Sequence, residues 1–128
     1  LLHAAFRERR EEFGIDLQGA RLLGELDELA TFAPLPPLII RPHVLLLDGE
    51  PRTTPNPAEV VSLHRISLAD LLRGVGRGTM PWRHQGRQIE LPRVDFDGVR
   101  LWGLTLRAVD DLLDRLDGRG KGLQRPCA

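Results

Sequence analysis

The stretch "HAAFRERREEFGI", residues 3–15, is the most informative part of the chain. Apolar residues recur at the spacing of one helical face from Leu2 to Phe13, which predicts a helix there. Gly14 is the residue type that commonly follows a helix end. Within this helix, residues 7–12 read "RERREE", a block in which every residue is charged. The predicted helix thus carries six consecutive charged residues just before its last residue.

The charged block has two interpretations. Mixed charges on a helix usually form a solvated face, and Arg7 with Glu11 is an ordinary i,i+4 pair. However, Glu8, Glu11 and Glu12 stand at i, i+3 and i+4, so their like charges share one side of the helix. The last two also lie in the final turn, where the helix dipole disfavours each anion by about 0.3–1 kcal/mol. A divalent cation would compensate this cost, so the block predicts either a solvated face or a metal site.

Composition excludes several classes of partner. The chain has 18 basic and 18 acidic residues, so no long-range field attracts nucleic acid or an anionic membrane, and we expect neither as a partner. Cys127 is the single cysteine, which excludes an internal disulfide and a Cys-rich zinc site and suits a reducing cytoplasm. No apolar run approaches the ~20 residues that span a bilayer. An anionic ligand must therefore be held by a local arrangement.

The length of 128 residues fits one domain. We assign residues 1–118 to this domain and residues 119–128 to a flexible C-terminal tail. The helix pattern is already under way at Leu1, so we expect the chain to be a fragment whose N-terminal part precedes this residue.

Strand patterns dominate the first half of the chain after the helix. Residues 20–32 predict one strand or two short ones. Residues 38–50 contain the strongest strand signal, and the apolar run at 44–47 predicts burial on both faces. Pro42 cannot donate to a ladder, so we expect a bulge or an edge there. Residues 59–66 predict a further strand.

The second half begins with a helix signal and continues with strands. Ser67 is a plausible N-cap for the segment "LADLLRG". The glycine-rich residues 74–81 predict a flexible loop, and because they follow a helix rather than a strand we do not read them as a phosphate-binding loop. Residues 82–103 predict two strands joined by a turn at Asp97-Gly98.

A second amphipathic helix is predicted over residues 104–117, ended by Gly118. Its apolar face consists of Val109, Leu112, Leu113 and Leu116. Strands mixed with two amphipathic helices predict a sheet with helices packed on it, in the α/β (α+β) class.

The charged block also resembles a family motif. Residues 7–15, "RERREEFGI", match R-E-U-x-E-E-x-G-U, the second half of the Nudix box G-x5-E-x7-R-E-U-x-E-E-x-G-U, where U is aliphatic. Every fixed position of this half is present, but Arg9 stands where U is expected. The first Gly and Glu of the box would fall before Leu1.

The remainder of the chain is similar to the coenzyme A pyrophosphatase branch of Nudix hydrolases. The similarity lies in "LGELDELAT" at 23–31, in Pro42 within a hydrophobic strand, in "NPAEVVSLHRISLADLL" at 56–72 and in "VRLWGLTLRAVDDLL" at 99–113. The resemblance runs from about residue 3 to about residue 117. It implies a Nudix-type α/β/α sandwich with a mixed β-sheet, incomplete at the N-terminus.

The resemblance also implies roles for individual residues. Glu11 and Glu12 would coordinate Mg²⁺ or Mn²⁺, and Glu8 would be a further ligand or the base that activates water. Arg7 would orient the glutamates. Glu59 is a candidate extra ligand or base, although a loop carboxylate at a strand start explains it equally well.

The function implied is metal-dependent cleavage of the diphosphate of coenzyme A or acyl-CoA, to 3′,5′-ADP and phosphopantetheine, or of a related nucleoside diphosphate derivative. A small-molecule nucleotide substrate, a cytoplasmic location and a homodimer are compatible with this reading. The alternatives are a non-catalytic Nudix-like binding or regulatory module, which Arg9 and the missing half of the box favour, and an inactive fragment.

Two histidines and two aromatic residues are predicted to have structural rather than catalytic roles. We interpret His43 and His64 as strand residues that are structural or line a pocket. The chain has only six Phe and Trp residues and no Tyr, so we expect Phe96 and Trp102 to serve the core rather than stack on a substrate.

Overall fold

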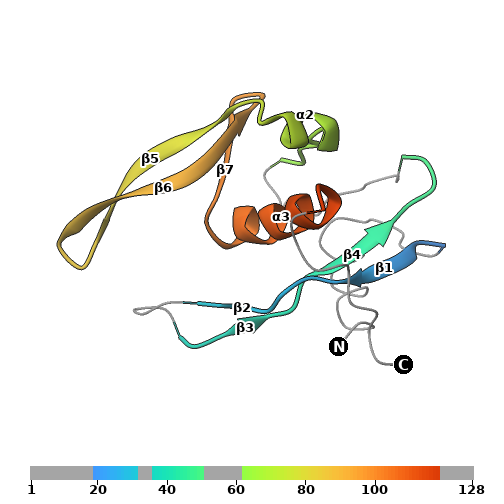
Figure 1. Cartoon of the computed structure of the whole chain (residues 1–128), viewed down its shortest axis with the longest axis horizontal. Coiled ribbons are helices and arrows are strands. Elements are labelled where there is room, and N and C mark those ends of the chain that lie inside the picture. Colours follow the sequence, from blue (N-terminus) through green and yellow to red (C-terminus); the bar gives the residue numbers. More distant parts are fainter. Residues whose placement is uncertain (1–18, 32–35, 51–61, 119–128) are drawn as a thin grey trace. The chain divides into compact units, whose positions relative to one another are not determined.

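The computed structural model describes residues 19–31, 36–50 and 62–118 (Figure 1). These residues form a mixed α+β structure of small antiparallel sheets and two helices. The predicted helix over residues 2–13 and the predicted tail 119–128 lie outside the described residues. No helix in the described part of the chain is long and apolar enough to cross a membrane.

Two short strand pairs occupy the first part of the described chain. β1 (Arg21–Glu25) pairs with β4 (His43–Leu46), and β2 (Leu29–Ala30) pairs antiparallel with β3 (Ile39–Ile40). Residues 20–32, for which one strand or two short ones were predicted, therefore contain two short strands.

Pro42, where a bulge or an edge was predicted, lies between β3 and β4 and belongs to neither strand. Its carbonyl accepts a hydrogen bond from the Leu26 amide at 3.0 Å, just after β1 ends. The expectation that residues 44–47 are buried on both faces is wrong, because Leu46 is 43% exposed and its neighbours are only partly buried. The described residues 62–66, where a strand was predicted, have no regular structure.

A three-stranded antiparallel sheet has the order β5 (Arg77–His84), β6 (Arg87–Phe96) and β7 (Val99–Trp102). The turn at Asp97-Gly98 is confirmed, with φ of 46° and 75°. A second turn of the same kind at Gln85-Gly86, with φ of 49° and 77°, was not predicted. Positive φ at both central residues suits the twist of a tight hairpin.

The predicted flexible loop over residues 74–81 is wrong for its second half, because β5 already begins at Arg77. This residue pairs with Val94 in β6, and the pairing extends without interruption to His84 opposite Arg87. Figure 1 shows β5 and β6 as a long hairpin.

The two helices have local signals at their ends. α2 (Leu68–Arg73) begins at Ser67, whose hydroxyl accepts a hydrogen bond from the Asp70 amide at 3.2 Å, as its N-cap role predicts. α3 (Gly103–Leu116) ends before Gly118, which has a φ of 74°.

The core lies between α2, α3 and one face of the three-stranded sheet. Its buried members are Leu71 of α2, Val94 of β6, and Leu106 and Leu113 of α3. Partly buried apolar side chains pack around them: Ile66, Phe96, Leu101 and Val109. The predicted core role of Phe96 is confirmed, whereas Leu116, predicted on the apolar face of the helix, is 51% exposed.

The chain divides into two compact units. One comprises residues 1–23 and 44–65, and the other comprises residues 24–43 and 66–128. The features described below lie within the second unit, apart from the predicted glutamate cluster and the segment around His64.

Candidate functional site

The predicted catalytic and metal-binding residues lie outside the described residues. They are Arg7, Glu8, Glu11, Glu12 and Glu59. Their mutual arrangement therefore stays a prediction from the sequence. Within residues 19–31, 36–50 and 62–118, no group of three or more His, Cys, Asp or Glu side chains is placed to hold a metal ion.

The two histidines singled out from the sequence have partners. His43 lies in β4, as predicted, and its Nε2 is 3.2 Å from Oε1 of Glu25 in the paired strand. His64 lies in an irregular segment rather than a strand, with its Nε2 2.7 Å from the Ser62 hydroxyl. Each histidine thus contacts a neighbouring side chain of the fold, in agreement with a structural role.

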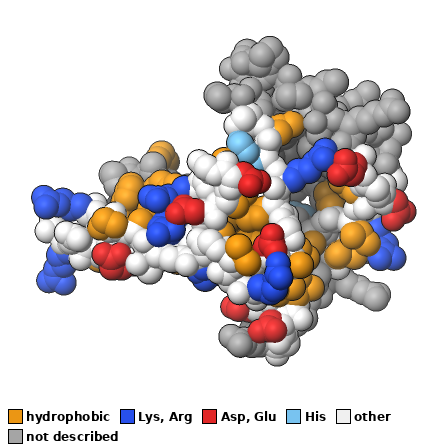
Figure 2. Space-filling model, turned by 90° about the horizontal axis from the view of Figure 1, so that it is seen from above, with side chains coloured by type: hydrophobic (Ala, Val, Ile, Leu, Met, Phe, Trp, Pro, Cys, Tyr) orange, Lys and Arg blue, Asp and Glu red, His pale blue; other side chains and the backbone are white. Residues whose placement is uncertain are grey.

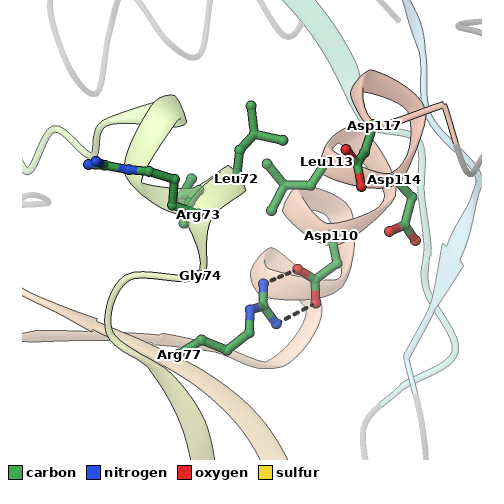
Figure 3. A pocket seen from close by; sticks show the side chains of 9 residues that line it. Leu72, Arg73, Gly74, Arg77, Asp110, Leu113, Asp114 and Asp117 are labelled. Atoms are coloured by element: carbon green, nitrogen blue, oxygen red, sulfur yellow. Dashed lines mark hydrogen bonds and ion pairs between the residues drawn. The ribbon is translucent and has the colours of Figure 1, made fainter.

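A hollow of about 380 Å³ lies between α2, the start of β5 and α3 (Figure 3). Its apolar wall is formed by leucines of both helices, with Leu72 and Leu113 facing each other. Its polar lining consists of Asp110 and Asp114 of α3, Asp117 just after this helix, and one arginine each from α2 and β5. The hollow is thus lined by both signs of charge.

Arg77 and Asp110 neutralise each other at one side of this hollow (Figure 3). The guanidinium donates to both carboxylate oxygens, with Nη1 3.2 Å from Oδ2. This hydrogen bonding raises the pKa of Arg77 above its ordinary value. Because the pair satisfies itself, it serves to join β5 to α3 rather than to present a free charge to a ligand.

A second arginine joins α3 to the segment after β1. The Arg115 side chain is only 3% exposed, and it donates to Asp111 and to Asp27. Burial opposes ionisation of Asp111, but hydrogen bonds from Arg115 and from the Asp27 amide outweigh it and leave the pKa of Asp111 below its ordinary value. These contacts hold the fold together, and no local pattern around Asp27 predicts that it pairs with Arg115.

The face of the three-stranded sheet opposite α3 carries both tryptophans of the chain. The ring centroids of Trp82 in β5 and Trp102 in β7 are 5.0 Å apart, with the ring planes at 44°. The rings are 41% and 40% exposed. The prediction that Trp102 serves the core is therefore wrong: among the described residues its ring packs on Trp82 at the surface.

Asp95 lies further along the same face, at the end of β6 next to the Asp97-Gly98 turn. Arg100 donates to it from Nε at 2.9 Å, and Arg93 donates to its other oxygen. Hydrogen bonding from Arg100, reinforced by Arg93, holds the pKa of Asp95 below its ordinary value. This carboxylate is thus fully compensated.

Comparison with known proteins adds no family assignment. No family model matches the chain, and no curated protein matches it.

Proposed function

We propose that the protein is a metal-dependent Nudix pyrophosphohydrolase that cleaves the diphosphate of coenzyme A, an acyl-CoA or a related nucleoside diphosphate derivative. The observation that carries the proposal is the sequence "RERREEFGI" at residues 7–15, which contains every fixed position of the second half of the Nudix box. The same proposal assigns the full fold to the Nudix α/β/α sandwich and the protein to the cytoplasm.

The donor set suits the metal. Three carboxylates on one helix side are the oxygen ligands that Mg²⁺ and Mn²⁺ prefer, and Glu11 and Glu12 are assigned as ligands with Glu8 beside them. The bound ion supplies charge screening for the diphosphate and lowers the pKa of a bound water. Glu8 then serves as ligand or as the group that accepts the water proton, and Arg7 orients the carboxylates by charge-assisted hydrogen bonds. Glu59 is the candidate for an additional ligand or base.

The described part of the chain supports the similarity further downstream. The segment "VRLWGLTLRAVDDLL" is a strand followed directly by a helix, β7 and α3. The segment around residues 67–73 is a capped helix, which agrees with the short helix expected there. This agreement in local structure supports the proposal.

The test is turnover of coenzyme A by the purified protein, with Mg²⁺ or Mn²⁺ added. Chromatography should separate 3′,5′-ADP and phosphopantetheine as products. Glu12→Gln removes one ligand charge at nearly constant size and should lower the rate by roughly a hundredfold or more. Glu90→Gln, an exposed carboxylate on β6, is the matched control and should leave the rate unchanged. Unchanged turnover in Glu12→Gln would remove the glutamate cluster from the mechanism.

A second candidate is a Nudix-like binding or regulatory module without catalysis. Arg9 favours it, because the motif has an aliphatic side chain at that position and a guanidinium would not pack in the same way. Calorimetric binding of a nucleotide diphosphate together with an absence of product for all tested diphosphates would establish this module. An inactive fragment would show neither binding nor turnover.

A further inference from the structure

The face of the sheet that carries the two tryptophans has the features of a ligand surface. We call it the tryptophan face and define it by Trp82, Ile89 and Trp102, which are each about two-fifths exposed. Met80 lies between these residues on the same face and is almost fully buried, at 8% exposure. The exposed part therefore consists of two indole rings, tilted by 44° to each other, and one aliphatic side chain beside a buried methionine.

The strand register fixes which side chains share this face. Side chains alternate along a strand, so Val94 and Leu101, which pack against α3, mark the opposite side. Trp82 stands opposite Ile89, and the next pair on the same face, towards the turn, is His84 opposite Arg87. Two residues along a strand amount to about 7 Å. An apolar, partly aromatic surface is thus followed, at that distance along the strands, by a pair of basic side chains.

The basic side chains at the Gln85-Gly86 end of the β5–β6 hairpin favour binding of an anion. Within residues 19–31, 36–50 and 62–118 the side chains of Arg87 and His84 make no hydrogen bond or ion pair, and Arg83 alternates to the opposite face of the hairpin. Glu90 alternates to the opposite face, and Asp95 is already compensated by two arginines. Figure 2 shows blue basic side chains at the end of the hairpin with orange hydrophobic side chains beside them.

We infer that the tryptophan face binds a nucleotide, with its base stacked on an exposed indole and its phosphate at Arg87 and His84. Indole rings stack on any base, and a guanidinium is the preferred partner of a phosphate. The two features stand two residues apart along the strands, about 7 Å between backbone positions, so a small ligand can reach both. The inference goes beyond the proposed hydrolysis, because it needs neither a metal ion nor the glutamate cluster.

A single nucleotide fits this face better than a nucleic-acid strand. A strand needs several stacking platforms and a basic groove along its backbone, whereas this face offers one aromatic pair and one basic pair. The chain as a whole has zero net charge, so it lacks the long-range field that supports nucleic-acid binding.

The experiment uses the fluorescence of the protein itself. Because the chain has only two tryptophans and both lie on this face, its tryptophan emission reports on this face alone. AMP and ADP, titrated with EDTA present, should quench the emission saturably, and inorganic phosphate alone should not. EDTA also separates the two proposals, since hydrolysis would stop while nucleotide binding would persist.

Substitutions then test each half of the face. Trp82→Ala should weaken AMP binding about tenfold, whereas Trp82→Phe, which keeps an aromatic surface, should retain most of it. Arg87→Ala should weaken AMP about tenfold but leave adenosine unchanged, because only the phosphate contact is lost. Arg21→Ala removes an exposed arginine of β1 and is the matched control. Circular dichroism confirms that each variant remains folded.

Three results would overturn the inference. The first is emission unaffected by millimolar AMP or ADP. The second is tighter binding of a single-stranded oligonucleotide than of AMP at equal base concentration. The third is a concentration-dependent dimer, seen by size-exclusion chromatography, that shields both tryptophans from an added quencher.

Discussion

Arg115 in α3 donates from Nη2 to Oδ1 of Asp27 at 2.9 Å, although the two residues are 88 positions apart in the chain. The arginine side chain is 3% exposed and the aspartate side chain is 67% exposed. The guanidinium also contacts Asp111, one helical turn earlier in α3. One buried cation therefore ties the segment after β1 to the last turn of α3.

We predict that Arg115→Met lowers the free energy of unfolding by about 2 kcal/mol, because a partly buried Asp111 loses its charged hydrogen bonds. Met retains much of the aliphatic packing of the arginine stem, so the loss reports mainly on charge. Urea denaturation measures it. Asp27→Asn should change stability by less than about 0.5 kcal/mol, since exposed ion pairs contribute little. Equal losses in both variants would contradict the dominant role of the buried contact.

Stability should fall in acid, partly through Asp111. The pKa of this carboxyl is below its ordinary value of about 3.9, so ionisation favours the folded state. Its contribution is complete above the ordinary pKa and disappears as the pH falls through the lower, folded-state value. Urea midpoints measured from about pH 7 to about pH 2 should decline less steeply for Asp111→Asn than for the parent. Asp48→Asn, at an exposed position, should follow the parent curve.

Gly76 cannot accept a side chain without movement of the backbone. Its φ is 74°, and a Cβ there would lie 2.0 Å from the carbonyl oxygen of Asp95. Gly76→Ala should therefore lower the free energy of unfolding by about 3 kcal/mol. Gly98→Ala is the control, because its φ is similar but the space around it is open, and it should cost only about 1 kcal/mol. Similar losses at both glycines would show that backbone conformation alone decides the effect.

The proposed glutamate cluster predicts direct binding of metal. Mn²⁺ should bind with a heat that calorimetry detects, and the double change Glu11→Gln with Glu12→Gln should weaken it by about a hundredfold. Glu28→Gln, an exposed carboxylate that pairs with Arg41, serves as the matched control. Binding that persists in the double variant would locate the metal elsewhere.

Local signals in the sequence predicted local structure well. The hydroxyl of Ser67 and the Asp97-Gly98 dipeptide each act on their immediate neighbours, so the cap and the turn could be predicted without knowledge of the fold. The Gln85-Gly86 turn was missed because glutamine rarely adopts a positive φ. β5 was missed because its glycine-rich start is ordered by pairing with β6, which no local pattern of residues 74–81 reveals.

The two candidate sites also differ in how far the sequence alone could reveal them. The glutamate cluster could be recognised because its members lie within one helical turn of each other in the sequence. The contact between Trp82 and Trp102 depends on the register of three strands and on which face α3 covers. Since Leu101 and Trp102 are adjacent apolar residues, the sequence could not decide which of them turns inward.

The hydrogen bond from the Asp27 amide to Asp111 joins residues 84 positions apart, which has a consequence for the order of folding. Closing a loop of that length costs about 4 kcal/mol of chain entropy, whereas the hairpins of β5, β6 and β7 close over a few residues. The sheet and α3 should form first and the segment around Asp27 should dock last. On the ribosome, that segment has to wait until α3 has emerged, and in pulse-labelled hydrogen exchange its amide should gain protection after those of β6.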